Sequence, residues 1–302
     1  MKSKLQLQRE NNYDLVMIVT CIDSKYIMHM INSVLINNNI VSTLIIFINQ
    51  SDLVYNLGGS NSKTIIKELK SNKISLSKAR NIGINYLIIN QLKFSHTMFP
   101  DDDSTFSESF FSNFKPQKER NYLIDVYGEG TERLFKKNRY HNGKVLGRYN
   151  YDAAMSVNMI INHKTFSLVG FFDERLGVGA KYGAGEDADY YIRACNVNLT
   201  GFIYNKHLFN FHPSSPNKFS KMKLSRVVDV YIKYGQGGIF TLCKHKMYKA
   251  ALKSCFWAIG GAAMSLIKFN FKLFLAYIMA FFARTLMLIN CIVNSKKLYK
   301  NA

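Results

Sequence analysis

Several features of common protein classes are absent from this 302-residue sequence. Its five cysteines are far apart and form no CxxC pair, which disfavours a disulfide framework or a zinc site and favours reduced thiols. There is no helix-turn-helix, zinc-finger or RNP pattern, no GxxxxGK[ST] phosphate loop and no internal repeat. The opening MKSKLQLQRENNYD has no apolar core segment, so we expect no secretory signal and a cytoplasmic protein.

Acidic residues are scarce: 20 Asp and Glu stand against 40 Lys and Arg, for a net charge of +20. Such a charge fits nucleic acid, an anionic membrane surface or anionic substrates. The basic residues become more frequent after residue 218, beside the most apolar part of the chain, which favours a membrane surface over nucleic acid as the partner. Nucleic-acid binding stays a third alternative, and it would show a steep salt dependence.

The first third of the chain alternates between short apolar runs and helical patterns. Strands are predicted at Leu15–Thr20, Leu44–Ile48 and His96–Phe99, and helices at Tyr26–Leu35 and Ser77–Ile89, with Ser77 as the expected N-cap. Continuous apolar strands between helices predict an α/β fold with a mainly parallel sheet flanked by helices. Ligands of such sheets bind beyond the carboxyl ends of the strands.

The middle of the chain combines strand-like runs with a second acidic group. Residues 122–127 and 155–161 have strand character, and Gly183–Asp189 carries three carboxylates before a helical run at Tyr190–Cys195. Carboxylates in the first turn of a helix also simply complement its dipole, and we expect Asp189 to cap this helix. We expect one α/β domain over residues 1–220 and a helical tail over 221–302.

Asp101, Asp102 and Asp103 follow the apolar run Met98–Pro100. Adjacent carboxylates repel one another and are costly to bury without a partner. A cluster of this kind at the end of a strand indicates a hard divalent cation, Mg²⁺ or Mn²⁺, with a phosphorylated substrate. The alternative is a solvated acidic loop or helix cap, where Asp is also common.

The tail contains two apolar stretches bracketed by lysines. Cys255–Ile267 is too short to span a bilayer, whereas Leu273–Val293 reaches the roughly 20 residues that a span needs. Arg284 near its middle would cost about 2.5–3.5 kcal/mol on insertion, so we favour attachment to the surface of an anionic leaflet. The alternative is a helical pair buried against the main domain.

Three motifs in order resemble family 2 glycosyltransferases of the GT-A fold. Ser75–Ile84 (SLSKARNIGI) resembles the family's ARN helix start, Phe99–Asp103 its DxD motif, and Phe172–Asp189 its FDE and GED block. The likeness covers about residues 13–215. It implies a Rossmann-like GT-A domain that transfers a sugar from a nucleotide sugar with inversion at the anomeric carbon.

The resemblance also assigns roles to residues that would bind the donor and the metal. Asp103, with Asp101 and His212, would hold Mn²⁺ or Mg²⁺, which bridges the donor diphosphate. For His212, a structural or merely exposed histidine is an alternative of equal weight to a metal ligand. The expected donor-binding residues, all near the carboxyl ends of the predicted strands or at the ARN helix, are Thr20, Asn49, Arg80, Asn81, Asp101 and Asp102.

An inverting transfer needs one general base to deprotonate the acceptor hydroxyl. The resemblance places this base in the second acidic group, and we expect it to be Asp187, with Glu186 orienting the acceptor or Asp187 itself. Arg80 would use its planar donor fork on the pyrophosphate, the alternative being a surface salt bridge. The sequence departs from the family after the second strand, where Asn49 stands in place of an expected carboxylate.

Together these motifs predict a metal-dependent glycosyltransferase at the inner face of the cell membrane. The expected donor is a nucleotide sugar, with a UDP-sugar as first choice, and the expected acceptor is a lipid-linked saccharide of a bacterial surface polysaccharide such as O-antigen or capsule. The main alternative is a catalytically silent partner that binds a sugar nucleotide or polysaccharide in a membrane assembly complex. Another metal-dependent phosphoryl-transfer enzyme is a further alternative.

Overall fold

The structure is a computed structural model, and it describes residues 12–22, 26–55, 61–131, 133–135, 140–213 and 219–294. The chain forms two compact units. The first unit comprises residues 1–74, 78–171 and 190–214, and the second comprises residues 75–77, 172–189 and 215–302. The boundary expected at residue 220 stays a prediction.

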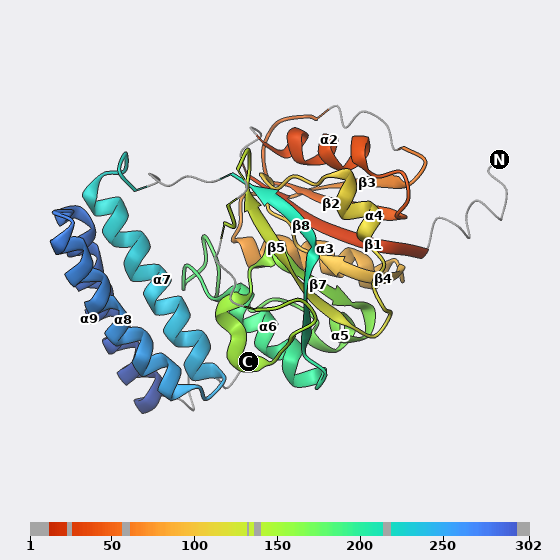
Figure 1. The fold of residues 1–302 in the computed structure, drawn as a ribbon. Coiled ribbons are helices and arrows are strands. Elements are labelled where there is room, and N and C mark those ends of the chain that lie inside the picture. The colour runs from red at the N-terminus through yellow and green to blue at the C-terminus, as the bar shows by residue number, and fades with distance from the viewer. Residues whose placement is uncertain are drawn as a thin grey trace. The chain divides into compact units, whose positions relative to one another are not determined.

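The first unit is built on one mixed sheet (Figure 1). Its strands lie in the order β3-β2-β1-β4-β7-β5-β8-β6. The pairs β1/β2, β2/β3, β1/β4 and β5/β8 are parallel, and β4/β7, β5/β7 and β6/β8 are antiparallel. The strand bounds are β1 Asn12–Cys21, β2 Thr43–Asn49, β3 Thr64–Lys70, β4 Lys93–Met98, β5 Asn121–Gly128, β6 Val145–Leu146, β7 Met159–Asn162 and β8 Phe202–His212.

Helices cover both faces of this sheet because β1 is apolar on both sides. Met17 and Val19 pack in one buried cluster with α2 (Ile27–Asn37), which lies above the strands in Figure 1, and with α4 (Glu108–Asn113). Ile18 faces the other way, toward Gly83 of α3 (Leu76–Ile89), where a Cβ would lie 2.6 Å from the Ile18 side chain. The remaining helical elements are η1 Arg148–Ala153, η2 Ser156–Asn158, α5 His163–Val169 and α6 Glu186–Val197.

Three long helices make up most of the second unit: α7 (Leu224–Lys244), α8 (Tyr248–Ile267) and α9 (Phe271–Val293). The aromatic ring of Tyr277 in α9 lies against both Tyr231 of α7 and Gly261 of α8, so α9 packs on both partners (Figure 1). By length and composition alone, α8 and α9 could each cross a membrane, with mean hydropathies of 1.4 and 1.8.

The predicted strands at the start of the chain are confirmed, but two local expectations are wrong. Strand β3 is not among the predicted strands, because three of the seven residues of its pattern TIIKELK are charged and it lies partly exposed at the edge of the sheet. Ser77 is not the N-cap of α3, since the helix already begins at Leu76. Its hydroxyl instead donates to the carbonyl of Leu176 at 2.7 Å.

Candidate metal and donor site

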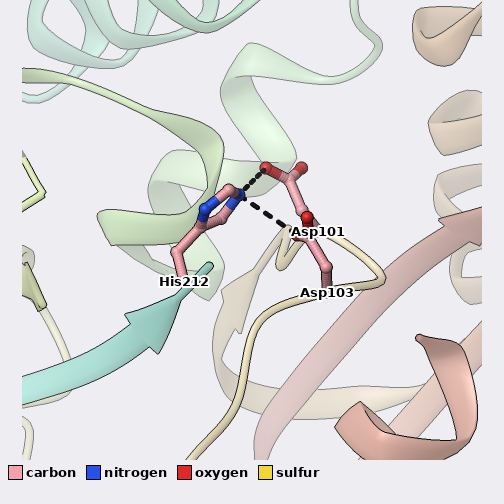
Figure 2. Close-up of side chains that lie close together, drawn as sticks. All are labelled: Asp101, Asp103 and His212. Atoms are coloured by element: carbon pink, nitrogen blue, oxygen red, sulfur yellow. Dashed lines mark ion pairs between the residues drawn. The ribbon is translucent and has the colours of Figure 1, made fainter. Parts of the chain in front are cut away.

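Two segments far apart in the sequence meet at a cluster of three metal-ligating side chains, Asp101, Asp103 and His212 (Figure 2). The two aspartates lie in the turn after β4, and His212 is the last residue of β8. One ligand atom from each residue lies within 4.8 Å of the others. Backbone hydrogen bonds in both directions between Thr105 and Phe211, each 2.9 Å long, hold the aspartate turn against the end of β8.

The chemistry of this cluster fits a divalent cation. His212 Nε2 lies 3.1 Å from Asp103 Oδ1 and 3.6 Å from Asp101 Oδ2. Nδ1 of the same ring lies 3.1 Å from the Pro213 carbonyl, and a proton on Nδ1 leaves the Nε2 lone pair facing the two carboxylates. The two carboxylates supply the oxygen ligands that Mn²⁺ and Mg²⁺ prefer, and the imidazole adds one nitrogen ligand.

The same geometry explains the charge state of His212 when no cation is bound. Burial alone would lower the pKa of this imidazole, but the hydrogen bonds to Asp101 and Asp103 outweigh burial and raise the pKa to about 10. The protonated ring then neutralises part of the carboxylate charge. The cluster is therefore a site that needs a positive charge.

Arg80 lies beside this cluster and is buried. Its side chain is 2% exposed, and Nη2 lies 3.4 Å from Asp101 Oδ1. The hydroxyl of Ser156 lies 3.5 Å from the same oxygen. The alternative of a surface salt bridge is wrong for Arg80, since the guanidinium is held inside the first unit. Asn81, the next residue of α3, is also buried.

Asp102 and Thr20 lie near the carboxyl end of the central strand β1. The pKa of Asp102 is raised to about 6: burial is the largest cause, the neighbouring Asp103 and Asp101 add to it, and a hydrogen bond with the Cys21 thiol opposes it. Thr20 is half-buried, is the residue before the last one of β1, and pairs with Ile48 of β2. Their donor-binding roles stay predictions.

Asn49 ends β2 and is completely buried. Its amide group donates to the Glu68 carboxylate at 2.7 Å and to the Leu53 carbonyl at 3.0 Å, and its oxygen accepts from the amide and the hydroxyl of Ser51. All its usual hydrogen bonds are therefore made within the first unit. Asn49 therefore shapes the loop that follows β2. The structure also places a carboxylate, Glu68 of β3, next to Asn49. The sequence does not indicate this contact, because β3 is not among the predicted strands.

The second acidic group lies in the second unit, in the first turn of α6. Glu186 is buried and Asp187 half-buried. Gly177 (φ +97°) packs against the Glu186 side chain, and a Cβ there would lie 3.3 Å from the carboxyl carbon. Gly185 (φ +96°) precedes the helix, in a backbone conformation that favours glycine. Their catalytic roles stay predictions.

Helix α7 fixes this loop through close contacts. A Cβ on Gly237 would lie 2.1 Å from the Ala184 carbonyl oxygen, so only glycine permits the observed approach. The hydroxyl of Thr241 donates to the Gly185 carbonyl at 3.2 Å. The turn that carries Glu186 and Asp187 is therefore held by α7.

Asp189 does not cap α6, contrary to the sequence-based expectation. The helix already starts at Glu186, and Asp189 is completely buried with Lys244 Nζ at 2.8 Å and His245 Nε2 at 2.9 Å. The same ammonium lies 2.8 Å from Asp173, whose carboxylate also pairs with Arg175 at 2.6 Å. This partly buried ion network, composed of Asp173, Arg175, Asp189, Lys244 and His245, ties the end of α7 to the acidic loop.

Comparisons with known proteins give the fold and no family. No protein-family model matches the sequence, and no curated protein matches it. Among solved structures, S. aureus TarS 1-349 aligns with a TM-score of 0.51 at 13% identity, over 93% of this chain and 92% of that one. The same protein in complex with UDP-GlcNAc gives 0.50 at 12% identity, over 93% and 92% of the two chains.

Two further alignments have the same strength. The mannosyltransferase PcManGT from Pyrobaculum calidifontis, in complex with GDP-Man and Mn²⁺, aligns with a TM-score of 0.50 at 8% identity, over 96% of this chain and 88% of that one. A longer TarS chain aligns at 0.50 and 14% identity over 77% of this chain, which covers 43% of its length. The predicted fold class is confirmed: the first unit has the mixed, helix-flanked sheet of the GT-A fold, and apolar helices follow it.

Proposed function

We propose that this chain is a metal-dependent glycosyltransferase that takes a sugar from a nucleotide sugar. The observation that carries the proposal is the cluster of Asp101, Asp103 and His212 beside the carboxyl ends of β1 and β4, in a chain with the GT-A fold. A cation held there would neutralise charge on the diphosphate leaving group. Structural neighbours bound to UDP-GlcNAc and to GDP-Man with Mn²⁺ support a nucleotide-sugar donor, with a UDP-sugar as first choice.

Around this cation, the protein's own groups would position the donor. Asp103 and His212 would ligate the metal together with Asp101, whose orientation is supported by Arg80 and Ser156. The Arg80 guanidinium, already desolvated, would contact the pyrophosphate. Asp102, Asn81 and Thr20 complete the proposed donor site, and Asn49 would shape it through its hydrogen bonds with Glu68 and Ser51.

For the acceptor, we propose Asp187 as the general base of an inverting transfer, with Glu186 as its orienting neighbour. A base must hold a defined position within hydrogen-bond reach of the acceptor hydroxyl. The close packing of α7 on the loop before α6 supports this role, because it fixes the turn that carries both carboxylates.

We propose a lipid-linked saccharide of a bacterial surface polysaccharide as the acceptor, reached from the inner face of the membrane. The support is the length and apolarity of α8 and α9 and the basic residues around them. The competing function is a silent sugar-nucleotide-binding partner in a membrane complex. A silent partner has no need of a base, so the presence of both Asp187 and a complete metal-ligand set in one chain favours the enzyme.

A donor-hydrolysis screen tests the proposal without knowledge of the acceptor. The purified protein would be incubated with UDP- and GDP-sugars, with Mn²⁺, with Mg²⁺ and with EDTA. We expect slow, metal-dependent release of one nucleoside diphosphate, lost in Asp103→Asn. Binding of a nucleotide sugar without turnover toward water or membrane-extract acceptors would favour the silent partner.

A further inference from the structure

A groove of about 1080 Å³ runs along one face of α8 in the second unit. Its lining residues on α8 recur at helical spacing, singly or in adjacent pairs, from Lys249 to Met264; Lys268 at the C-cap of α8 also lines it, and Tyr277 and Arg284 line it from α9. The middle is apolar: Phe256, Trp257 and Met264 are 60%, 69% and 52% exposed. Side chains of this size are rarely left so open in one patch on a soluble protein.

One end of this groove is cationic. Lys249 and Lys253 lie one turn apart on α8, and Arg284 lines the groove at the same end, with Nη1 donating to the Ser254 carbonyl at 2.6 Å. Arg284 Nε is buried and makes no hydrogen bond to the described residues. The groove therefore has three cations at the Lys249 end and one, Lys268, at the other, with an apolar floor over the roughly 22 Å from Lys249 to Met264.

The charge of the surrounding sequence favours an anionic ligand over a cationic one. Every Asp or Glu of the chain lies at or before Asp229, so each charged residue after it is Lys or Arg. Gly260 gives the groove its depth, because a Cβ there would meet no atom within 4 Å. A ligand with an anionic head and an apolar chain matches both parts of this surface.

We propose that this groove binds one anionic lipid molecule, with its phosphate at Lys249, Lys253 and Arg284 and one hydrocarbon chain along Phe256, Trp257 and Gly260. This site is more specific than general attraction of a basic tail to a membrane. It extends the proposed membrane attachment, and it does not depend on sugar transfer.

The chain contains a single tryptophan, and Trp257 lies in this groove, so its fluorescence reports on the site alone. The protein would be titrated with a short-chain phosphatidic acid below its micelle concentration, with the matching phosphatidylcholine and with inorganic phosphate. We expect a saturable blue shift with phosphatidic acid, at least about tenfold weaker binding of phosphatidylcholine, and no shift with phosphate. Equal binding of the two lipids would overturn the proposal, as would a shift with phosphate alone.

Two variants test the two halves of the groove. Lys249→Glu combined with Lys253→Glu should weaken phosphatidic acid binding at least about tenfold, whereas Lys63→Glu combined with Lys93→Glu, an equal charge change in the first unit, should leave it unchanged. Gly260→Leu should fill the groove and weaken binding similarly, while Gly260→Ala retains most of it. If both charge pairs weaken binding equally, or if Gly260→Leu binds as wild type, the groove is not the site.

Asp103→Asn separates this inference from the proposed function. That variant lacks a metal ligand of the first unit, and we expect wild-type lipid binding from it. If the wild-type protein binds the lipid but no nucleotide, the proposed sugar transfer is contradicted and the lipid site in the groove is not. Loss of lipid binding in Asp103→Asn, with the fold intact, would count against the groove.

Discussion

His212 Nε2 lies 3.1 Å from Asp103 Oδ1, although one residue ends β8 and the other follows β4. The paired backbone hydrogen bonds between Thr105 and Phe211 set this distance, because they hold the aspartate turn to the end of the strand. The fold itself thus brings the proposed ligands together. Such preorganisation lowers the conformational cost of binding.

Removal of the imidazole tests whether His212 takes part in the metal site. We expect His212→Ala to weaken Mn²⁺-dependent nucleotide binding by about tenfold or more, since one of three protein ligands is lost. His207, an exposed histidine of the same strand, supplies the matched control, and His207→Ala should bind as wild type. Equal binding by both variants, measured by calorimetry, would leave His212 with a structural role only.

Asp187→Asn tests the proposed base. We expect loss of transfer by about 10²–10⁴-fold with donor binding retained, because general-base catalysis supplies a factor of this size and the amide cannot accept the proton. Glu119→Gln, at an exposed acid of the first unit, should transfer at the wild-type rate. Near-full transfer by Asp187→Asn would move the base to another residue.

Two adjacent glycines of α7 test how the acidic loop is held. Gly237→Ala should lower the free energy of unfolding by about 1–3 kcal/mol, because the new methyl group would lie 2.1 Å from the Ala184 carbonyl oxygen. Gly238→Ala meets nothing within 4 Å and should stabilise the helix by up to about 1 kcal/mol. Urea denaturation of both variants gives the comparison, and an equal effect of the two changes would contradict the packing described.

The ion network around Lys244 predicts a specific loss of stability in acid. Burial alone would raise the pKa of Asp173, but hydrogen bonds from Arg175 and Lys244 outweigh it and lower the pKa to about 2. A carboxylate with a lowered folded-state pKa stabilises the protein above its unfolded pKa of about 4 and loses that effect as the pH falls toward 2.

Asp173→Asn should therefore be less stable than wild type by about 2 kcal/mol at neutral pH. The difference in free energy of unfolding should shrink as the pH falls from about 4 to about 2. Denaturation curves across this range measure it. A difference that stays constant, or grows in acid, would show that Asp173 contributes through packing and not through its charge.

The sequence predicted the buried parts of the fold well because apolar runs carry a strong signal. Strands β1, β2 and β4 and the apolar helix α9 lie where they were expected. Helix α8 starts at Tyr248, before the apolar stretch expected from Cys255, and at 20 residues it is not too short to span a bilayer. Strand β3 was missed because Lys67, Glu68 and Lys70 give it the composition of a loop. The antiparallel β7 at the centre of the sheet was also beyond prediction, since a short apolar run does not indicate the direction of its neighbours.

At the site, the sequence could name residues but not their environments. Asp101, Asp103 and His212 are the metal ligands that the sequence predicts, and the structure brings these three side chains together. Burial of Arg80 and of Asp189 could not be foreseen, because charged residues are almost always exposed and their partners Asp101 and Lys244 are distant in sequence. Long-range ion pairs of this kind become visible only in three dimensions.

The most direct test of the central claim is calorimetric titration of the protein with UDP, GDP and CMP, each with and without Mn²⁺. The account predicts metal-dependent binding of one nucleotide, UDP being the first choice, and its loss in Asp103→Asn. Absence of binding by any of the three nucleotides, in protein shown to be folded, would contradict the proposed glycosyltransferase site.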